Sequence, residues 1–99
     1  MMQGTTPTHT YILPIATSDI AALRITYKQN KDIVLEKEKT DVKLSGNTIS
    51  LDLTQEETLM FDENIVARIQ IHGRTKAGKA FASKVMRVPV YELLNKAVI

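Results

Sequence analysis

The sequence predicts an all-β protein, an antiparallel β-sandwich in a single domain. Apolar and polar residues alternate with a period of two in several short segments, which is typical of strands with one buried face. Turn-forming residues separate these segments at intervals of about 8–12 residues, as in sandwiches. A chain of 99 residues has the length of one domain. We assign residues 1–99 to it and expect residues 1–6 to be flexible.

The first segment, 8–14, follows Pro7 and ends at Pro14. His9 and Tyr11 alternate with Thr10 and Ile12 along it. Because proline has no amide hydrogen to donate to a neighbouring strand, it is tolerated at strand ends and sheet edges. We therefore expect a short strand at the edge of a sheet.

Segments 20–29 and 33–39 predict a hairpin. In the first segment the apolar side chains fall on one face, and they are Leu23, Ile25 and Tyr27. A polar turn at 30–32 joins it to the second segment, in which Ile33 and Leu35 share a face before the chain becomes charged.

A second hairpin is expected from short strands at 42–44 and 48–53. Gly46 and Asn47 between them accept the positive φ angles of tight turns.

The residues that follow predict a short helical turn near 54–60. Thr54 and Glu57 match a capping box, in which the side chain of each residue accepts the backbone N–H of the other.

The last two strands are expected at 64–74 and 80–88. Alternation is clean in the first of them, and Gly78 marks the turn between the two. The second is ambiguous in phase, because Phe81 suits one face and Met86 the other. A bulge, or burial on both faces, would account for this pattern.

A short C-terminal helix is expected after Pro89. Residues 91–95 contain helix-forming residues, and Leu94 and Val98 would then fold onto the sheet.

About seven strands with almost no helix predict a sandwich of immunoglobulin-like type. The chain has no cysteine and no tryptophan, so it lacks the disulfide and core tryptophan of antibody domains. The residues expected to be buried between the two sheets are Leu23, Ile25, Ile49, Leu51, Ile69 and Ile71.

Composition argues against several classes of function. Without cysteine there is neither a disulfide framework nor a thiolate metal site. The two histidines, His9 and His72, form no short ligand motif, and the four glycines form no phosphate-binding loop. No segment approaches the ~18–20 apolar residues of a membrane helix, and no signal peptide is visible. We expect no enzymatic activity, no cofactor, no metal and no membrane partner.

Charge is unevenly placed along the chain. Residues 64–99 carry seven Lys/Arg and one acid, Glu92, whereas residues 1–63 carry six Lys/Arg and ten Asp/Glu. The basic residues are either the solvent faces of strands or a surface for nucleic acid. The candidate nucleic-acid residues are Arg68, His72, Lys84 and Arg87.

Two segments are candidate surfaces for a protein partner. The edge of the first strand carries unpaired backbone groups, which can accept an added strand. The C-terminal segment is too apolar for a free tail, so it either folds back on the sandwich or docks on a partner. The candidate partner-binding residues are Tyr11, Ile12, Tyr91, Leu93, Leu94 and Val98.

Several runs resemble a family of small proteins, of about this length, from phages and prophages of Gram-positive gut bacteria. These runs are residues 4–14, 24–30, 45–49 and 53–58. The expected fold also resembles, in pattern rather than in matched residues, the N-terminal β-sandwich of siphophage upper-baseplate proteins. The resemblance implies a tail- or baseplate-associated module without catalytic residues, located in the virion or in the cytoplasm of the bacterial host.

The function expected from the sequence is therefore that of a non-enzymatic phage structural or adaptor protein. It would act through protein–protein contacts with other virion proteins or with a second copy of itself. Two alternatives stay open. One is a nucleic-acid-binding module that uses the basic C-terminal strands, and the other is a small host-directed interaction protein.

Overall fold

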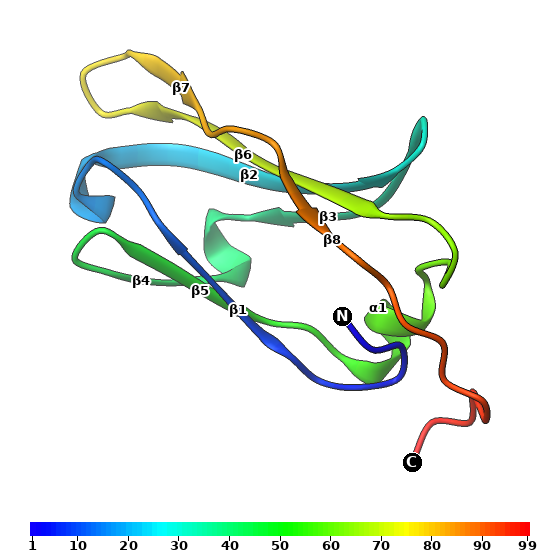
Figure 1. Cartoon of the computed structure of the whole chain (residues 1–99). Helices are drawn as coiled ribbons and strands as arrows, with labels where there is room; N and C mark the ends of the chain where they lie inside the picture. The colour runs from blue at the N-terminus through cyan, green and yellow to red at the C-terminus, as the bar shows by residue number, and fades with distance from the viewer.

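A computed structural model describes residues 1–99 as two antiparallel sheets that pack face to face (Figure 1). The smaller sheet has the order β1-β5-β4 and contains β1 (Thr8–Ile12), β5 (Thr48–Asp52) and β4 (Lys43–Ser45). The larger sheet has the order β3-β2-β6-β7, with β8 also paired to β6. Its strands are β2 (Ile20–Gln29), β3 (Asp32–Glu38), β6 (Ala67–Thr75), β7 (Ala80–Ala82) and β8 (Met86–Val88). The predicted all-β sandwich is confirmed, with eight strands in place of about seven.

The strand order corresponds to that of an immunoglobulin-like sandwich. The β1-β5-β4 sheet matches strands B, E and D of that fold, and the β3-β2-β6-β7 sheet matches strands C′, C, F and G. No strand of this chain lies where strand A would pair, because β1 pairs with β5 alone. The expectation that the first strand lies at a sheet edge is thus confirmed.

Local turn chemistry determines how the strands connect. Gly46 between β4 and β5 has a φ of 59°, and Gly78 between β6 and β7 has a φ of 87°. Asn30 takes a φ of 54° in the turn between β2 and β3. Asparagine tolerates this left-handed conformation better than most residues, so the turn closes without a glycine.

The predicted helical turn is present as α1 (Gln55–Leu59). The Glu57 amide donates to Thr54 Oγ1 at 3.1 Å, and the Thr54 amide donates to Glu57 Oε1 at 2.9 Å. This is the expected capping box. Two short 3-10 turns, η1 (Thr17–Asp19) and η2 (Lys39–Asp41), join further strands.

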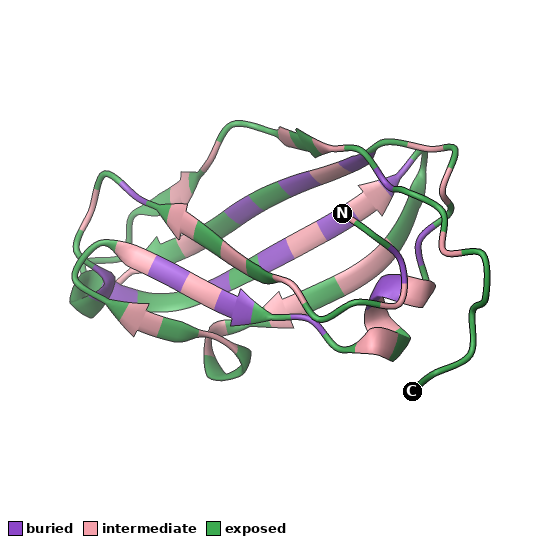
Figure 2. Cartoon of the chain, turned by 60° about the horizontal axis from the view of Figure 1, so that its bottom comes forward, coloured by how far each residue is buried: buried purple, intermediate pink, exposed green.

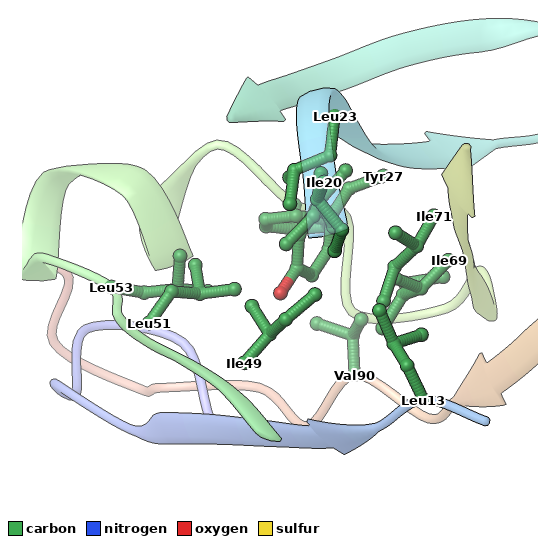
Figure 3. Packing of buried hydrophobic residues seen from close by; sticks show 13 residues of the cluster. Leu13, Ile20, Leu23, Tyr27, Ile49, Leu51, Leu53, Ile69, Ile71 and Val90 are labelled. Atoms are coloured by element: carbon green, nitrogen blue, oxygen red, sulfur yellow. The ribbon is translucent and has the colours of Figure 1, made fainter. Parts of the chain in front are cut away.

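The core lies between the two sheets (Figure 3). All six residues expected there are buried, and Figure 2 shows buried and exposed residues alternating along the strands. The complete cluster is Leu13, Ile20, Leu23, Ile25, Tyr27, Ile49, Leu51, Leu53, Phe61, Ala67, Ile69, Ile71 and Val90. The period-two pattern therefore assigned the faces of β2, β5 and β6 correctly. It was wrong for β3, where a register shift leaves Ile33 55% exposed while Val34 and Leu35 pack against the core.

Strand β6 begins at Ala67, three residues after the predicted start, because of the buried side-chain amide of Gln29. Gln29 Nε2 donates to the carbonyls of Asp62 and Ile65, each at 2.8 Å, and the Asp62 amide donates to Gln29 Oε1 at 2.8 Å. Because these backbone groups are taken by a side chain, residues 62–65 form a loop.

The ambiguous phase of 80–88 corresponds to an interruption between β7 and β8. Both strands pair with β6, and Ser83 lies in the break. Its Oγ accepts the Ile71 amide at 3.0 Å. Phe81 and Met86 both pack against the core although they are five positions apart, an odd number that would put them on opposite faces of a regular strand. The break therefore changes the phase as a bulge does.

The predicted C-terminal helix is wrong. Residues 91–95 are not helical, and Tyr91 instead forms a parallel bridge with Met2. The Tyr91 amide donates to the Met1 carbonyl at 2.8 Å, and the Leu93 amide donates to Gln3 Oε1 at 3.1 Å. A helix this short gains little by itself, so these non-local hydrogen bonds determine the conformation. Leu94, expected on the sheet, is 92% exposed.

Residues 1–6 contribute to this arrangement. Gln3 is 1% exposed, and its Nε2 donates to the Phe61 carbonyl at 2.6 Å. Leu93 fills the space beside Gly4, whose φ of 71° also disfavours a side chain there. Flexibility of these residues stays a prediction, while the structure gives Gln3 buried partners.

Replacement of a core isoleucine tests the assignment of faces. Ile69→Ala should lower the free energy of unfolding by ~2–5 kcal/mol, because it leaves a cavity between the sheets. An exposed, outward-facing residue of the same strand is the control, and His72→Ala should cost less than ~0.5 kcal/mol in the same urea titration. A loss below ~0.5 kcal/mol for Ile69→Ala would contradict the assigned face.

Candidate protein-interaction edge

The backbone of β1 is hydrogen-bonded on one side. Its residues pair with β5 in the register His9↔Leu51 and Tyr11↔Ile49. Just outside the strand, the Leu13 amide donates to the Asn47 carbonyl at 2.8 Å, and the Leu53 amide donates to the Pro7 carbonyl at 3.0 Å.

These two bonds identify which residues of β1 face β5. In an antiparallel pair, alternate residues exchange hydrogen bonds with the partner strand. Odd-numbered residues therefore direct their backbone groups toward β5, and the even-numbered residues direct theirs away from it. The N–H and C=O groups of Thr8, Thr10 and Ile12 point to the free edge, where no strand of the chain pairs with them.

The odd-numbered side chains of β1 face the core, and two of them contact Tyr27 on β2. Tyr27 on β2 is 0% exposed. Its hydroxyl lies 2.7 Å from His9 Nδ1 and 3.0 Å from the Tyr11 hydroxyl. The rings of His9 and Tyr27 stack with their centroids 5.8 Å apart. In Figure 3 the hydroxyl of Tyr27, the one oxygen drawn as a stick, points from β2 toward the opposite sheet.

Burial perturbs the titration of all three groups. It lowers the pKa of His9, because a charged imidazolium loses hydration there, and the N-terminal ammonium lowers it further. Burial raises the pKa of Tyr27 and of Tyr11. The Tyr27 hydroxyl lies within hydrogen-bond distance of both His9 Nδ1 and the Tyr11 hydroxyl, so it is satisfied in either tautomer of a neutral His9.

The other sheet edges are less open to an added strand. β3 is the longer edge strand, but it carries Asp32, Glu36, Lys37 and Glu38, and charged side chains discourage pairing. β4 has three residues, and the edge formed by β7 and β8 is interrupted at 83–85. The five residues of β1 carry no Asp, Glu, Lys or Arg.

An apolar hollow of about 390 Å³ lies beside the free edge. Its walls come from the end of β1 and the residues after it, and from β7, β8 and the break between them in the opposite sheet. Its lining residues are Ile12, Leu13, Pro14, Ile15, Phe81, Ala82, Ser83, Lys84 and Met86. Ile12 is 75% exposed, so an apolar side chain from outside would find apolar contacts here.

The structure separates the predicted partner-binding residues into two places. Ile12 lies at the free edge, whereas Tyr11 points inward and is half-buried. The C-terminal residues lie at the other place, beside α1 and the N-terminus. Of these, Leu93 packs against the chain beside Gly4, while Tyr91, Leu94 and Val98 are exposed. The tail is thus folded back at Val90 and Leu93 and exposes its other apolar side chains.

The four predicted nucleic-acid residues lie in three places. Arg68 and Arg87 lie opposite each other on β6 and β8. His72 is opposite Arg24, in a separate hollow, and Lys84 lies in the hollow beside the β1 edge. The structure adds Lys28, directly opposite Arg68, which the sequence search for basic C-terminal strands missed because it lies on β2.

No group of three or more His, Asp or Glu side chains is placed to hold a metal ion. No helix is both long and apolar enough to cross a membrane.

The chain matches no protein-family model, and neither the curated proteins nor the solved structures include a match to it. The resemblance to small phage proteins thus stays a prediction.

Two features were not predicted from the sequence. They are the hydrogen-bonded cluster around Tyr27 and the identity of the β1 residues whose backbone groups face the free edge. Alternation placed His9 and Tyr11 on one face, which was a usable signal. The cluster needs in addition the stacking of β1 on β2, which depends on how the two sheets pack.

The lowered pKa of His9 predicts how stability depends on pH. The unfolded chain takes up the proton near the ordinary histidine pKa of about 6.5, and the folded chain does so at lower pH. His9 therefore lowers the free energy of unfolding as pH falls below about 6.5. Urea titrations from pH 8 to 5 should show this decline in the wild type and in His72→Gln, and a smaller decline in His9→Gln. An equal decline in all three proteins would contradict this role of His9.

Proposed function

We propose that the chain is a non-enzymatic structural or adaptor protein that acts through protein–protein contacts, with the free edge of β1 as its contact surface. The supporting observation is the row of outward N–H and C=O groups on Thr8, Thr10 and Ile12, on a strand without charged side chains. An edge of this kind accepts an extended segment through main-chain hydrogen bonds.

The partner segment would occupy the position of strand A in an immunoglobulin-like sheet. It would lie next to β1 and extend the order β1-β5-β4 by one strand. Its apolar side chains would enter the hollow beside Ile12, where Phe81 and Met86 supply the opposite wall. Main-chain hydrogen bonds would provide affinity, and this hollow would provide specificity.

The resemblance to small phage and prophage proteins supports partners from a virion. Tail or baseplate proteins encoded beside this chain are the first candidates, and a second copy of the chain is another. Neither kind of contact needs a catalytic residue.

A proline at the centre of the edge tests the contact. Thr10→Pro removes one outward N–H and leaves the hydrogen bonds to β5 in place, since Thr10 does not donate to β5. In light scattering with tail and baseplate proteins encoded by adjacent genes, the wild type should form a complex. Thr10→Pro should weaken it about tenfold or more, because it loses a hydrogen bond and adds a steric clash with the added strand.

Thr10→Val is the matched control, since it keeps the amide and should bind like the wild type. Ile12→Pro provides a second blocked amide, and thermal melting checks that each variant is folded. A wild-type chain that stays monomeric with each of these proteins would contradict the adaptor function. A complex that both proline variants retain in full would instead place the contact away from β1.

A further inference from the structure

Three basic side chains form a row across the outer face of the larger sheet. Lys28 on β2 lies directly opposite Arg68 on β6, and Arg68 lies directly opposite Arg87 on β8. Their sequence neighbours on β2 and β6 are buried, so these side chains point away from the core. Neighbouring strands are about 4.8 Å apart, which places the Cα atoms of the three basic residues within roughly 10 Å along the row.

This row has no acidic partner. The ion pairs of the chain are Arg24–Glu38, Lys37–Glu57 and Lys96–Glu63. Arg68 instead donates to the carbonyl of Asn30, at 2.5 Å. Like charges directly opposite each other on a sheet are destabilising. On the same face Arg24 is neutralised by Glu38 at 3.0 Å. Arg74 also lacks an acidic partner there, but it lies opposite Ala22 and Ala80, so the row is where uncompensated cations are directly opposite one another.

A hollow adjoins the two arginines. It lies between the β2–β3 turn and the segment before β6, and Asn30, Lys31, Asp32 and Ile65 line it together with Arg68 and Arg87. Lys31 brings a fourth cation to its rim, against the single acid Asp32. Guanidinium groups bind oxyanions through paired N–H donors, so two adjacent arginines at a hollow suit a tetrahedral anion.

We propose that Lys28, Arg68 and Arg87 form a binding site for a phosphate group. A phosphate group supplies several strong acceptor oxygens and close to two negative charges. These are the acceptors and the negative charge that no side chain of the protein provides to the row. Binding would also relieve the repulsion along the row, so the free energy of binding includes that gain.

The surroundings favour one bound phosphate group over an extended nucleic-acid strand. The outer face of this sheet presents no aromatic side chain from β2, β6 or β8, so bases have no stacking platform. Glu36 and Glu38 lie on the same face along β3, opposite Thr26 and Arg24, and would repel a polyanion that continued across the sheet.

The test uses inorganic phosphate and the full chain at low ionic strength. In an NMR titration the arginine Nε–Hε signals of Arg68 and Arg87 should shift saturably with phosphate. Arg87→Gln should weaken this binding about tenfold, the loss expected for one charge-assisted hydrogen bond. Arg74→Gln is the matched control, because Arg74 is on the outer face of β6 but opposite Ala22 and Ala80.

Thermal melting gives a second readout in case Arg68→Gln fails to fold. Phosphate should raise the melting temperature of the wild type and of Arg74→Gln, since a ligand that binds the folded state stabilises it. At the same phosphate concentration it should raise that of Arg87→Gln much less, because binding is about tenfold weaker. Without phosphate, Arg87→Gln should melt at or above the wild-type temperature, because one like-charge contact is gone.

Three results would overturn the proposal. The first is an absence of saturable shifts with phosphate. The second is equal shifts with sodium glutamate at matched ionic strength, which would indicate a general response to anions. The third is binding of duplex DNA without any response to inorganic phosphate, which would indicate an extended electrostatic surface and no phosphate site.

Discussion

The hydroxyl of Tyr27 is the constraint on which the arrangement of the first strand depends. It lies at the centre of the core with no exposure to water, and an unpaired hydroxyl there would cost about 1–3 kcal/mol. His9 and Tyr11 satisfy it from the opposite sheet. Both must therefore face inward, and a slip of β1 by one residue would remove both from Tyr27 and turn Thr10 and Ile12 toward the core.

The same alternation of odd- and even-numbered residues along β1 determines which backbone groups are free. In a strand, the residues whose side chains share a face also share a hydrogen-bonding side. Because His9 and Tyr11 face the core, their backbone groups reach β5, and those of Thr8, Thr10 and Ile12 are left at the edge. One buried polar contact thus connects core packing to the proposed contact surface. Charge on β3 and the interruption at 83–85 make the remaining edges poorer templates.

Local sequence signals predicted most of the fold. Alternation identified the buried faces, and Thr54 with Glu57 predicted the helical turn. The errors have one physical origin, which is side chains that bond to distant backbone. The Gln29 side chain hydrogen-bonds to backbone carbonyls of residues 62–65, where a strand was predicted to start. The Gln3 side chain accepts the Leu93 amide, where a C-terminal helix was predicted. Glutamine is usually a surface residue, so no pattern in the sequence signals this burial. The basic row was missed for a different reason, since strand pairing brings Lys28 to Arg68 from distant sequence.

Amide hydrogen exchange along β1 tests the central claim most directly. If the Tyr27 contact determines which residues of β1 hydrogen-bond to β5, the amides of His9 and Tyr11 should be protected from exchange in the isolated chain, because they donate to β5. Those of Thr8, Thr10 and Ile12 should exchange much faster, and this alternation should disappear when a partner strand covers the edge. Protection of Thr10 and Ile12 equal to that of Tyr11 in the monomer would contradict a free edge and the function proposed for it.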